Sequence, residues 1–288
     1  MPELPEVETV RLQLLRKVAG KEIESVEVFH SKSVNHDETI EDKLRGKVIK
    51  SIDRVGKLMI FTFEDEENLF LLAHLKMTGQ FFYVDSSGEV VGGGHTYTAA
   101  KKEEFPQRHS RVGFNFTDHT TLYFNDMRLF GYTKLANKDE LLKAKSNFGP
   151  EPIHPEFDCE WFTKKLKLRK TPIKAALLNQ AFIAGLGNIY VDEALWRAKI
   201  KPTRRADKLT KTEAAALCAA AGDVMNESIS VGGTTFQSFV DTDGEHGNFK
   251  DYLQVFGQQG KPCPRCGETI KKIRCAGRGT HYCPGCQK

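Results

Sequence analysis

The chain lacks any apolar run that approaches the ~20 residues needed by a membrane-spanning helix. Its first residues, MPELPEVETV, are acidic and contain no basic region followed by an apolar one, so we expect no secretory signal. With 40% hydrophobic and 28% charged residues, the composition indicates a globular protein of the cytoplasm that does not bind a membrane. Its 288 residues are enough for two domains with separate cores.

Acidic residues are scarce in two segments of the C-terminal half. From Trp161 to Tyr190 there are six basic residues and no acidic one, and residues 257–288 hold seven basic residues and a single acid, Glu268. The net charge is only +4, so the distribution of charge says more than its sum. Such segments are typical of a polyanion-binding surface, although either one alone could be an ordinary solvated surface.

The chain also lacks an even number of cysteines, because it has seven, and Cys159, Cys218 and Cys275 are scattered along the sequence. This argues against a disulfide framework and for a metal site. The remaining four form two C-x-x-C pairs separated by 16 residues: Cys263, Cys266, Cys283 and Cys286. This is the ligand pattern of a closed tetrahedral site without room for water, so we expect one structural Zn²⁺.

The N-terminal half is predicted to form one helix followed by strands. Apolar residues at helical spacing run from Val7 to Val18, and Gly20 is a plausible end of the helix. Short apolar or β-branched runs then predict a sandwich or barrel. The predicted strands are Ile23–Phe29, Val48–Val55, Leu58–Phe63, Leu69–Leu75, Gln80–Val84, Val112–Phe116, Leu122–Asn125 and Tyr132–Leu135. The polar, Gly-rich stretch Ser86–His109 predicts a long loop.

The pattern changes to helices in the C-terminal half. The predicted helices are Phe157–Leu168, Pro172–Ala184, Asn188–Ala198 and Thr210–Ser230. Between the second and third, Gly185 and Gly187 permit a tight turn, and Asn188 could cap the helix that follows. A helix N-terminus of this kind suits a phosphate group, but a turn used only for packing is an equally good interpretation.

The first residues carry a second candidate site. If Met1 is removed, the chain begins with the secondary amine of Pro2, and α-amino groups have a pKa near about 7.7–8.0, well below that of lysine. Such an amine could attack a sugar at its anomeric carbon and form a cationic iminium, with Glu3 shuttling protons. The alternative from these residues alone is that Pro2 and Pro5 merely start a helix.

Four motifs occur in one chain and in a fixed order. They are MPELPEVETV at the start, Asn125–Gly131 (NDMRLFG), Ala184–Leu195 (AGLGNIYVDEAL) and Arg278–Gln287 (RGTHYCPGCQ). Together they closely resemble bacterial formamidopyrimidine-DNA glycosylase over essentially the whole chain. The resemblance implies an α+β multidomain fold and a monomer that binds damaged double-stranded DNA near the nucleoid, in a cleft between its two halves.

The implied domains follow the motifs along the chain. Residues 1–136 would form a catalytic helix and β-sandwich domain, and residues 137–155 a linker. Residues 156–248 would form a helix–two-turn–helix DNA-binding domain, and residues 249–288 a Cys₄ zinc-finger hairpin.

The resemblance also implies three catalytic residues, Pro2, Glu3 and Lys57, and a lesion-pocket residue, Glu6. Pro2 would be the Schiff-base nucleophile and Glu3 the main acid/base catalyst. Glu6 would support the N-terminus, and Lys57 would contact the DNA phosphate beside the lesion.

Further residues are implied to contact DNA. Asn188 and Arg278 would grip the phosphates that flank the flipped nucleotide, and His95 would also bind DNA. The wedge that fills the vacated base stack would consist of Met77, Arg128 and Phe130. Glu193 is a candidate contact to the extruded base.

The expected activity is that of a bifunctional glycosylase and AP lyase that excises 8-oxoguanine and formamidopyrimidines and cleaves the strand by β,δ-elimination. The sequence departs from the usual pattern at Met127, where proline is common, at Asn179, where aspartate is, and at Lys76, where glycine is. The alternatives are an endonuclease VIII-like glycosylase for oxidised pyrimidines, whose sequences tend to begin MPEGPE, and a non-catalytic zinc-finger protein that binds DNA.

Overall fold

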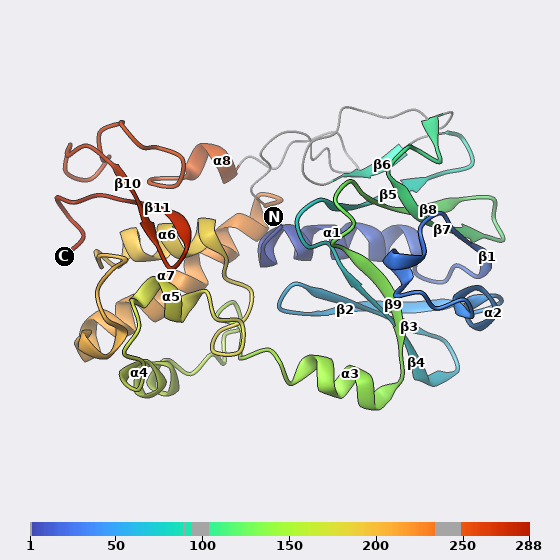
Figure 1. Ribbon diagram of the computed structural model, residues 1–288, viewed down its shortest axis with the longest axis horizontal. Helices are drawn as coiled ribbons and strands as arrows, with labels where there is room; N and C mark the ends of the chain where they lie inside the picture. Colours follow the sequence, from blue (N-terminus) through green and yellow to red (C-terminus); the bar gives the residue numbers. More distant parts are fainter. Residues whose placement is uncertain (1, 89, 94–103, 234–248) are drawn as a thin grey trace. The chain divides into compact units, whose positions relative to one another are not determined.

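The computed structural model describes residues 2–88, 90–93, 104–233 and 249–288, and its described part contains no helix long and apolar enough to cross a membrane. The chain folds into two compact units (Figure 1). The first contains the chain up to Lys145 together with Gly232 and Gly233, and the second contains Ser146–Val231 and Phe249–Lys288. The second unit thus contains both the helices of the C-terminal half and the cysteine-rich end.

The first unit is a sandwich of two antiparallel sheets with a long helix at its N-terminus. One sheet has the strand order β1-β7-β8-β5-β6 and the other β2-β3-β4-β9. The first sheet consists of β1 (Ile23–Val28), β5 (Gly79–Val84), β6 (Val90–Gly93), β7 (Ser110–Phe116) and β8 (Thr121–Asp126). The second consists of β2 (Ile49–Val55), β3 (Leu58–Phe63), β4 (Glu66–His74) and β9 (Tyr132–Ala136). All eight predicted strands are present, and β6 is an additional strand inside the stretch predicted as a loop.

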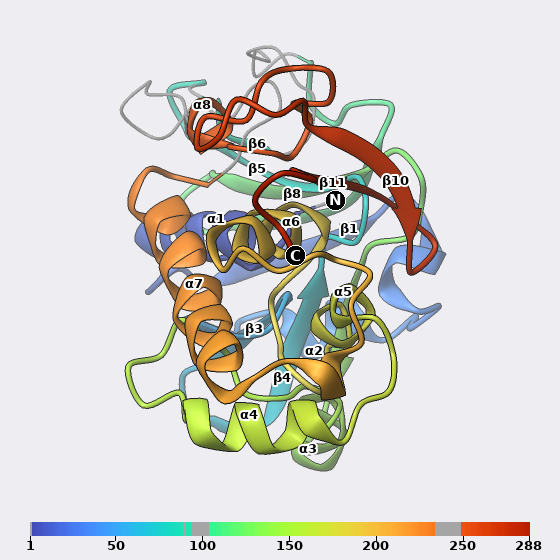
Figure 2. The ribbon, with the colours of Figure 1, turned by 90° about the vertical axis from the view of Figure 1, so that its left-hand side faces the viewer.

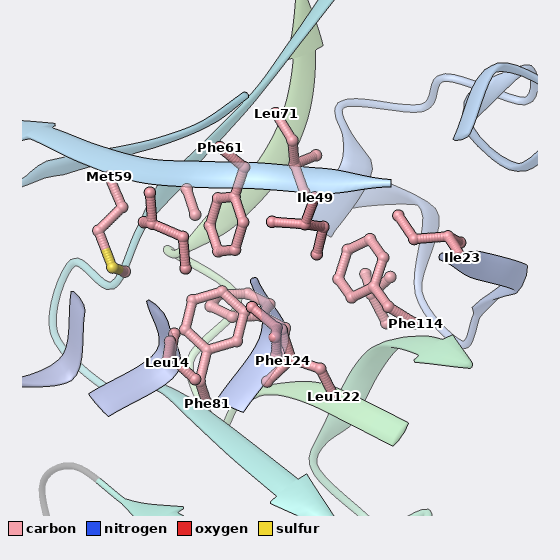
Figure 3. Packing of buried hydrophobic residues seen from close by; sticks show 14 of the residues in the cluster. Leu14, Ile23, Ile49, Met59, Phe61, Leu71, Phe81, Phe114, Leu122 and Phe124 are labelled. Carbon is pink, nitrogen blue, oxygen red and sulfur yellow. The ribbon is translucent and has the colours of Figure 1, made fainter. Parts of the chain in front are cut away.

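Helix α1 (Leu4–Val18) runs along the space between the two sheets and contacts β2, β3 and β5 (Figure 1). Its apolar stripe is buried as the spacing predicts, and the charges Glu6 and Arg16 lie at the ends that suit the helix dipole. Figure 3 shows Leu14 of this helix in the core, where Phe61 of one sheet faces Phe81 and Phe124 of the other. The sandwich is therefore held by apolar packing between two sheets and one helix.

The first unit also contains short helices outside the sandwich. They are α2 (Ile40–Leu44) and α3 (Lys138–Lys145), with a 3₁₀ turn at Ser31–Val34. The α3 helix packs against β4 and β9 and occupies part of the segment predicted as a linker.

The second unit is a small helical layer with a zinc-finger hairpin. Its helices are α4 (Cys159–Lys167), α5 (Ile173–Leu177), α6 (Asn188–Arg197), α7 (Lys211–Ser230) and α8 (Phe249–Tyr252), with a 3₁₀ turn at Ala206–Lys208. The hairpin consists of β10 (Lys271–Cys275) and β11 (Arg278–Tyr282). Figure 2 shows α7, which packs against both α4 and α6.

Two expectations about this unit are wrong. Helix α5 ends at Leu177 instead of Ala184, because the side chains of Asn179 and Gln180 accept the N–H groups of Ala181 and Gly185 and fold the following residues into turns. The second concerns the scattered cysteines, for which no disulfide was expected. Cys159 and Cys218, which lie 59 residues apart, form a disulfide that joins α4 to α7.

Candidate functional site

The start of α1 fixes the first residues of the chain in a buried position. Pro2 is buried and the Glu3 side chain is 2% exposed. Glu3 precedes the helix as its N-cap, and its backbone N–H donates to Glu6 Oε2 at 2.7 Å, the arrangement found in a capping box. Pro5 in the first turn and the Glu3–Glu6 capping box suit a helix start, as the alternative interpretation requires, and the same arrangement leaves a buried carboxyl group next to Pro2.

Lys57 lies in the two-residue turn of the β2–β3 hairpin and is 5% exposed. Gly56 before it has a positive φ of 55°, as expected at the first position of such a turn. His74, at the end of β4, lies near the positive charges of Lys57 and Lys76. Burial, with Lys76 and Lys57 nearby, lowers the pKa of His74 to about 3, so this imidazole is neutral at physiological pH. Its Nδ1 accepts the backbone N–H of Lys76 at 3.0 Å.

The three predicted wedge residues lie together on two neighbouring loops. Met77 and Phe130 are 39% and 48% exposed, so both side chains are accessible to solvent. The Arg128 guanidinium lies 4.6 Å from the centre of the Phe130 ring, and its Nη1 is 3.4 Å from the sulfur of Met77. Met127, the departure from the usual proline, is 56% exposed and leaves this cluster intact.

Asn188 and the tip of the finger hairpin meet in the second unit. Asn188 was expected to cap α6, but it is the first residue of that helix, and Gly187 takes the N-cap position. The Asn188 side chain instead donates from Nδ2 to the carbonyl of Gly279 at 3.0 Å. Arg278, the residue before Gly279, is exposed and begins β11 after the two-residue turn Ala276–Gly277. The two predicted phosphate-binding residues are therefore brought together by one hydrogen bond.

A buried ion pair lies next to the contact between Asn188 and Gly279. Lys174 of α5 and Asp192 of α6 are both 0% exposed, and Lys174 Nζ lies 2.6 Å from Asp192 Oδ1. Lys174 Nζ also donates to the Gly279 carbonyl at 3.3 Å, and Asp192 Oδ2 accepts the backbone N–H of His281 at 2.8 Å. These contacts join two helices to β11. These contacts could not be predicted from residue spacing, since the partners lie 18 to 105 residues apart in the sequence.

Glu193 has a different environment from the one expected of a base contact. Its side chain is 1% exposed, and its carboxylate accepts the backbone N–H groups of Gln254, Val255 and Phe256 at 2.8–3.0 Å. Burial raises the pKa of Glu193, while the three N–H donors act in the opposite direction. In this structure Glu193 therefore anchors the segment that leads into the finger.

The four predicted zinc ligands converge. The Sγ atoms of Cys263, Cys266, Cys283 and Cys286 all lie within 4.8 Å of one another. Two of the separations are 3.9 Å (Cys263–Cys286) and 3.3 Å (Cys266–Cys283). Zn–S bonds of about 2.3 Å in a tetrahedron place sulfur atoms roughly 3.8 Å apart, so this set fits one zinc ion.

Two further side chains lie against these thiols. Trp196 of α6 donates from Nε1 to Cys263 Sγ at 3.4 Å, and Arg265 donates from Nη1 to Cys286 Sγ at 3.7 Å. The Arg265 guanidinium also covers the Trp196 ring at 3.9 Å. Donors of this kind stabilise thiolate ligands and connect the metal site to α6. Of the predicted site residues, only His95 lies outside the described part of the chain.

Comparison with known proteins gives one consistent family. The formamidopyrimidine-DNA glycosylase N-terminal domain matches residues 1–133, the H2TH domain of the same glycosylase matches residues 148–240, and the zinc finger found in FPG and IleRS matches residues 260–288. The formamidopyrimidine-DNA glycosylases of Pelotomaculum thermopropionicum and Exiguobacterium sibiricum are 42% and 40% identical to the chain, with 100% of this chain and 99% of each relative covered.

Solved structures agree with this result. A Lactococcus lactis FPG mutant in complex with DNA that contains Fapy-dG has a TM-score of 0.86 at 36% identity, with 100% of both chains covered. The complex between the Lactococcus lactis Fpg and DNA that contains an abasic site has a TM-score of 0.85 at 35% identity, again with full coverage of both chains.

Proposed function

Because the chain belongs to the formamidopyrimidine-DNA glycosylase family, whose members are glycosylases for damaged DNA, we propose that it excises oxidised purines and then cleaves the strand with Pro2 as the nucleophile. The observation that carries the nucleophile assignment is the start of α1, where Pro2 is buried beside the buried carboxyl group of Glu3. Removal of Met1 is required, because only then is the Pro2 nitrogen a free secondary amine.

The proposed chemistry follows from that amine. The Pro2 lone pair forms a bond to C1′ of the damaged nucleotide, and the glycosidic bond breaks as the base leaves with its electron pair and a proton. Opening of the sugar gives an iminium cation, which makes the neighbouring C2′–H acidic. Loss of this proton expels the 3′ phosphate, and a second elimination expels the 5′ phosphate. Glu3, which follows Pro2 in the chain and is buried, is the candidate to move these protons.

The remaining residues would bind and distort the DNA. Extrusion of a base costs a few kcal/mol of unstacking, and inserted apolar and guanidinium groups offset part of this cost. The exposed cluster of Met77, Arg128 and Phe130 has the composition for that task. Lys57, Asn188 and Arg278 would bind phosphates as donors or cations. We infer that the protein acts as a monomer on damaged duplex DNA of the nucleoid.

An excision panel of single-lesion duplexes tests this proposal. Excision of 8-oxoguanine opposite cytosine is expected to be much faster than excision of thymine glycol, because Leu4 and the Arg128–Phe130 segment match the purine-specific pattern. The reverse order would assign the protein to the endonuclease VIII-like class. Lesion binding without strand cleavage would instead favour a non-catalytic zinc-finger protein.

A further inference from the structure

We propose that Asp126 is the positioning residue of the wedge, because its buried carboxylate joins the two loops that carry Met77, Arg128 and Phe130. Asp126 itself is 0% exposed and belongs to none of the catalytic or DNA-contacting groups described above. The inference rests on the proposed function, since a wedge is needed only by an enzyme that extrudes a base.

The sheet register brings the two loops together. The first loop connects β4 to β5, and the second connects β8 to β9, so each crosses from one sheet of the sandwich to the other. At one side of the crossing Gly79 pairs with Asp126, and at the other side His74 pairs with Tyr132. Residues 75–78 and 127–131 therefore run side by side between the same two pairs of strands, and Asp126 lies where the second loop begins.

The Asp126 carboxylate forms hydrogen bonds to both loops. On one oxygen, Oδ1 accepts the hydroxyl of Thr78 and the backbone N–H of Arg128, the latter at 3.1 Å. The other oxygen, Oδ2, accepts the N–H groups of Phe130 and Gly131 at 2.8 and 2.7 Å. The Thr78 hydroxyl also accepts the Arg128 N–H at 3.2 Å, so Met77 and Arg128 are coupled through one small network. An ionised carboxylate has enough lone pairs for all these donors, and a neutral amide does not.

The local backbone needs this support. Leu129 has a positive φ of 55°, a conformation that an L-residue with a side chain rarely adopts, and the N–H groups on either side of it both donate to Asp126. Gly131 permits the close approach, because a Cβ atom there would lie 2.8 Å from Phe124 Cζ and 3.2 Å from Asp126 Oδ2. The turn through Leu129 places Arg128 and Phe130 where guanidinium and ring contact each other. A wedge held in this way is ordered before DNA arrives, so little conformational entropy is lost on insertion.

The test compares two substrates that differ in their need for extrusion. Asp126→Asn replaces one acceptor oxygen by a donor, and Thr78→Val removes the hydroxyl that links the loops while leaving the carboxylate in place. Single-turnover excision of 8-oxoguanine from a duplex should fall by about tenfold to a hundredfold in Asp126→Asn, as loss of a charge-assisted hydrogen bond predicts, and several-fold in Thr78→Val. Cleavage of a preformed abasic site, which needs less help to leave the stack, should stay within about threefold of wild type.

A spectroscopic readout and a matched control complete the experiment. The fluorescence of 2-aminopurine placed beside the lesion should rise more slowly with both variants, because base unstacking is the step that the wedge assists. Asp118→Asn is the control. Asp118 lies three residues before the first residue of β8, at the end of the strand away from the wedge, and its carboxylate likewise accepts hydrogen bonds, from the N–H and hydroxyl of Thr120. This variant should behave as wild type on both substrates.

The inference is wrong if Asp126→Asn and Thr78→Val leave excision unchanged. It is equally wrong if excision and abasic-site cleavage fall in parallel, because Asp126 would then merely hold the fold. Failure of the proposed function is seen separately in the wild-type protein, which would not excise 8-oxoguanine at all.

Discussion

The first unit buries aliphatic and aromatic side chains between its sheets and keeps its buried charges, Glu3, Lys57 and Asp126, at the chain start, in a hairpin turn and at the end of a strand. The second unit instead buries Lys174, Asp192 and Glu193 where its helices meet the finger. In the first unit the proposed nucleophile and wedge lie beyond the core, at the chain start and on loops. In the second unit the buried charges connect α5, α6 and β11, the strand that begins with Arg278.

The reason for the difference lies in the amount of apolar material. The core around the finger consists of Val255, Ile270 and buried cysteine, with Trp196 packed against it, which is too little to hold a module by hydrophobic burial alone. Metal ligation and buried polar contacts supply the rest. Changes at the functional residues of the first unit should therefore alter chemistry more than stability, whereas changes at the zinc ligands and buried charges of the second unit should alter stability as well.

The largest effect expected in the first unit is chemical. Extension of the N-terminus by one residue before Pro2 acylates the amine and removes its lone pair as a nucleophile, so strand cleavage should fall by roughly a thousandfold or more. Borohydride should trap an enzyme–DNA adduct on the peptide that begins at Pro2 in the processed protein and not in the extended one. DNA affinity and thermal unfolding should remain unchanged. Mapping of the adduct to an internal lysine would rule out this assignment.

The largest effect expected in the second unit is loss of metal. Cys283→Ser should abolish zinc binding, which supplies on the order of 10 kcal/mol to the folding of small zinc modules, and DNA binding should disappear with it. Cys275→Ser is the matched control, because Cys275 is buried in the same hairpin but lies outside the sulfur cluster. Zinc content by atomic absorption and DNA affinity should be normal in the control. Retention of zinc by the Cys283 variant would contradict the ligand assignment.

The features that could be predicted from the sequence are those that depend on a local pattern of residues. The strands of the sandwich follow from runs of apolar residues, and the cysteine pairs converge as their spacing predicts. Strand β6 was missed, because its segment, VVGG, is short and rich in glycine, which is depleted in strands.

Contacts between distant residues could not be predicted in this way. Asn188 bonds to Gly279 across 91 residues, and this contact replaces the capping role that its position suggests. Asp126 stands within a recognised motif, yet its role depends on the pairing of Gly79 with β8, which no single segment reveals. The Cys159–Cys218 disulfide likewise depends on α4 packing against α7.

A smaller effect, on stability, should follow from breaking the buried ion pair. Lys174→Met leaves Asp192 charged and buried without its cation, which should destabilise the second unit by about 3–5 kcal/mol in chemical denaturation. The double variant Lys174→Met with Asp192→Asn should recover part of this loss, because the amide is neutral and can still accept the His281 N–H. A loss below about 1 kcal/mol in the single variant would show that the pair does not hold this unit together.

The smallest effect should come from Arg278, which is exposed and therefore contributes little to folding. Its guanidinium can bind two phosphate oxygens at once, so Arg278→Ala should weaken DNA binding about tenfold and reduce the dependence of log K on log salt by about one unit. Excision of 8-oxoguanine should slow more than cleavage of an abasic site.

Arg274→Ala is the control for Arg278→Ala, because Arg274 pairs with Gly279 on the opposite strand of the same hairpin and is also exposed. Both variants remove one positive charge from the hairpin, so a general electrostatic attraction would weaken binding equally in the two. A specific phosphate contact would weaken it in the Arg278 variant alone, with zinc content and unfolding unchanged in both. Equal losses would mean that Arg278 attracts DNA only through its charge, and the proposed phosphate contact would then be left to Asn188.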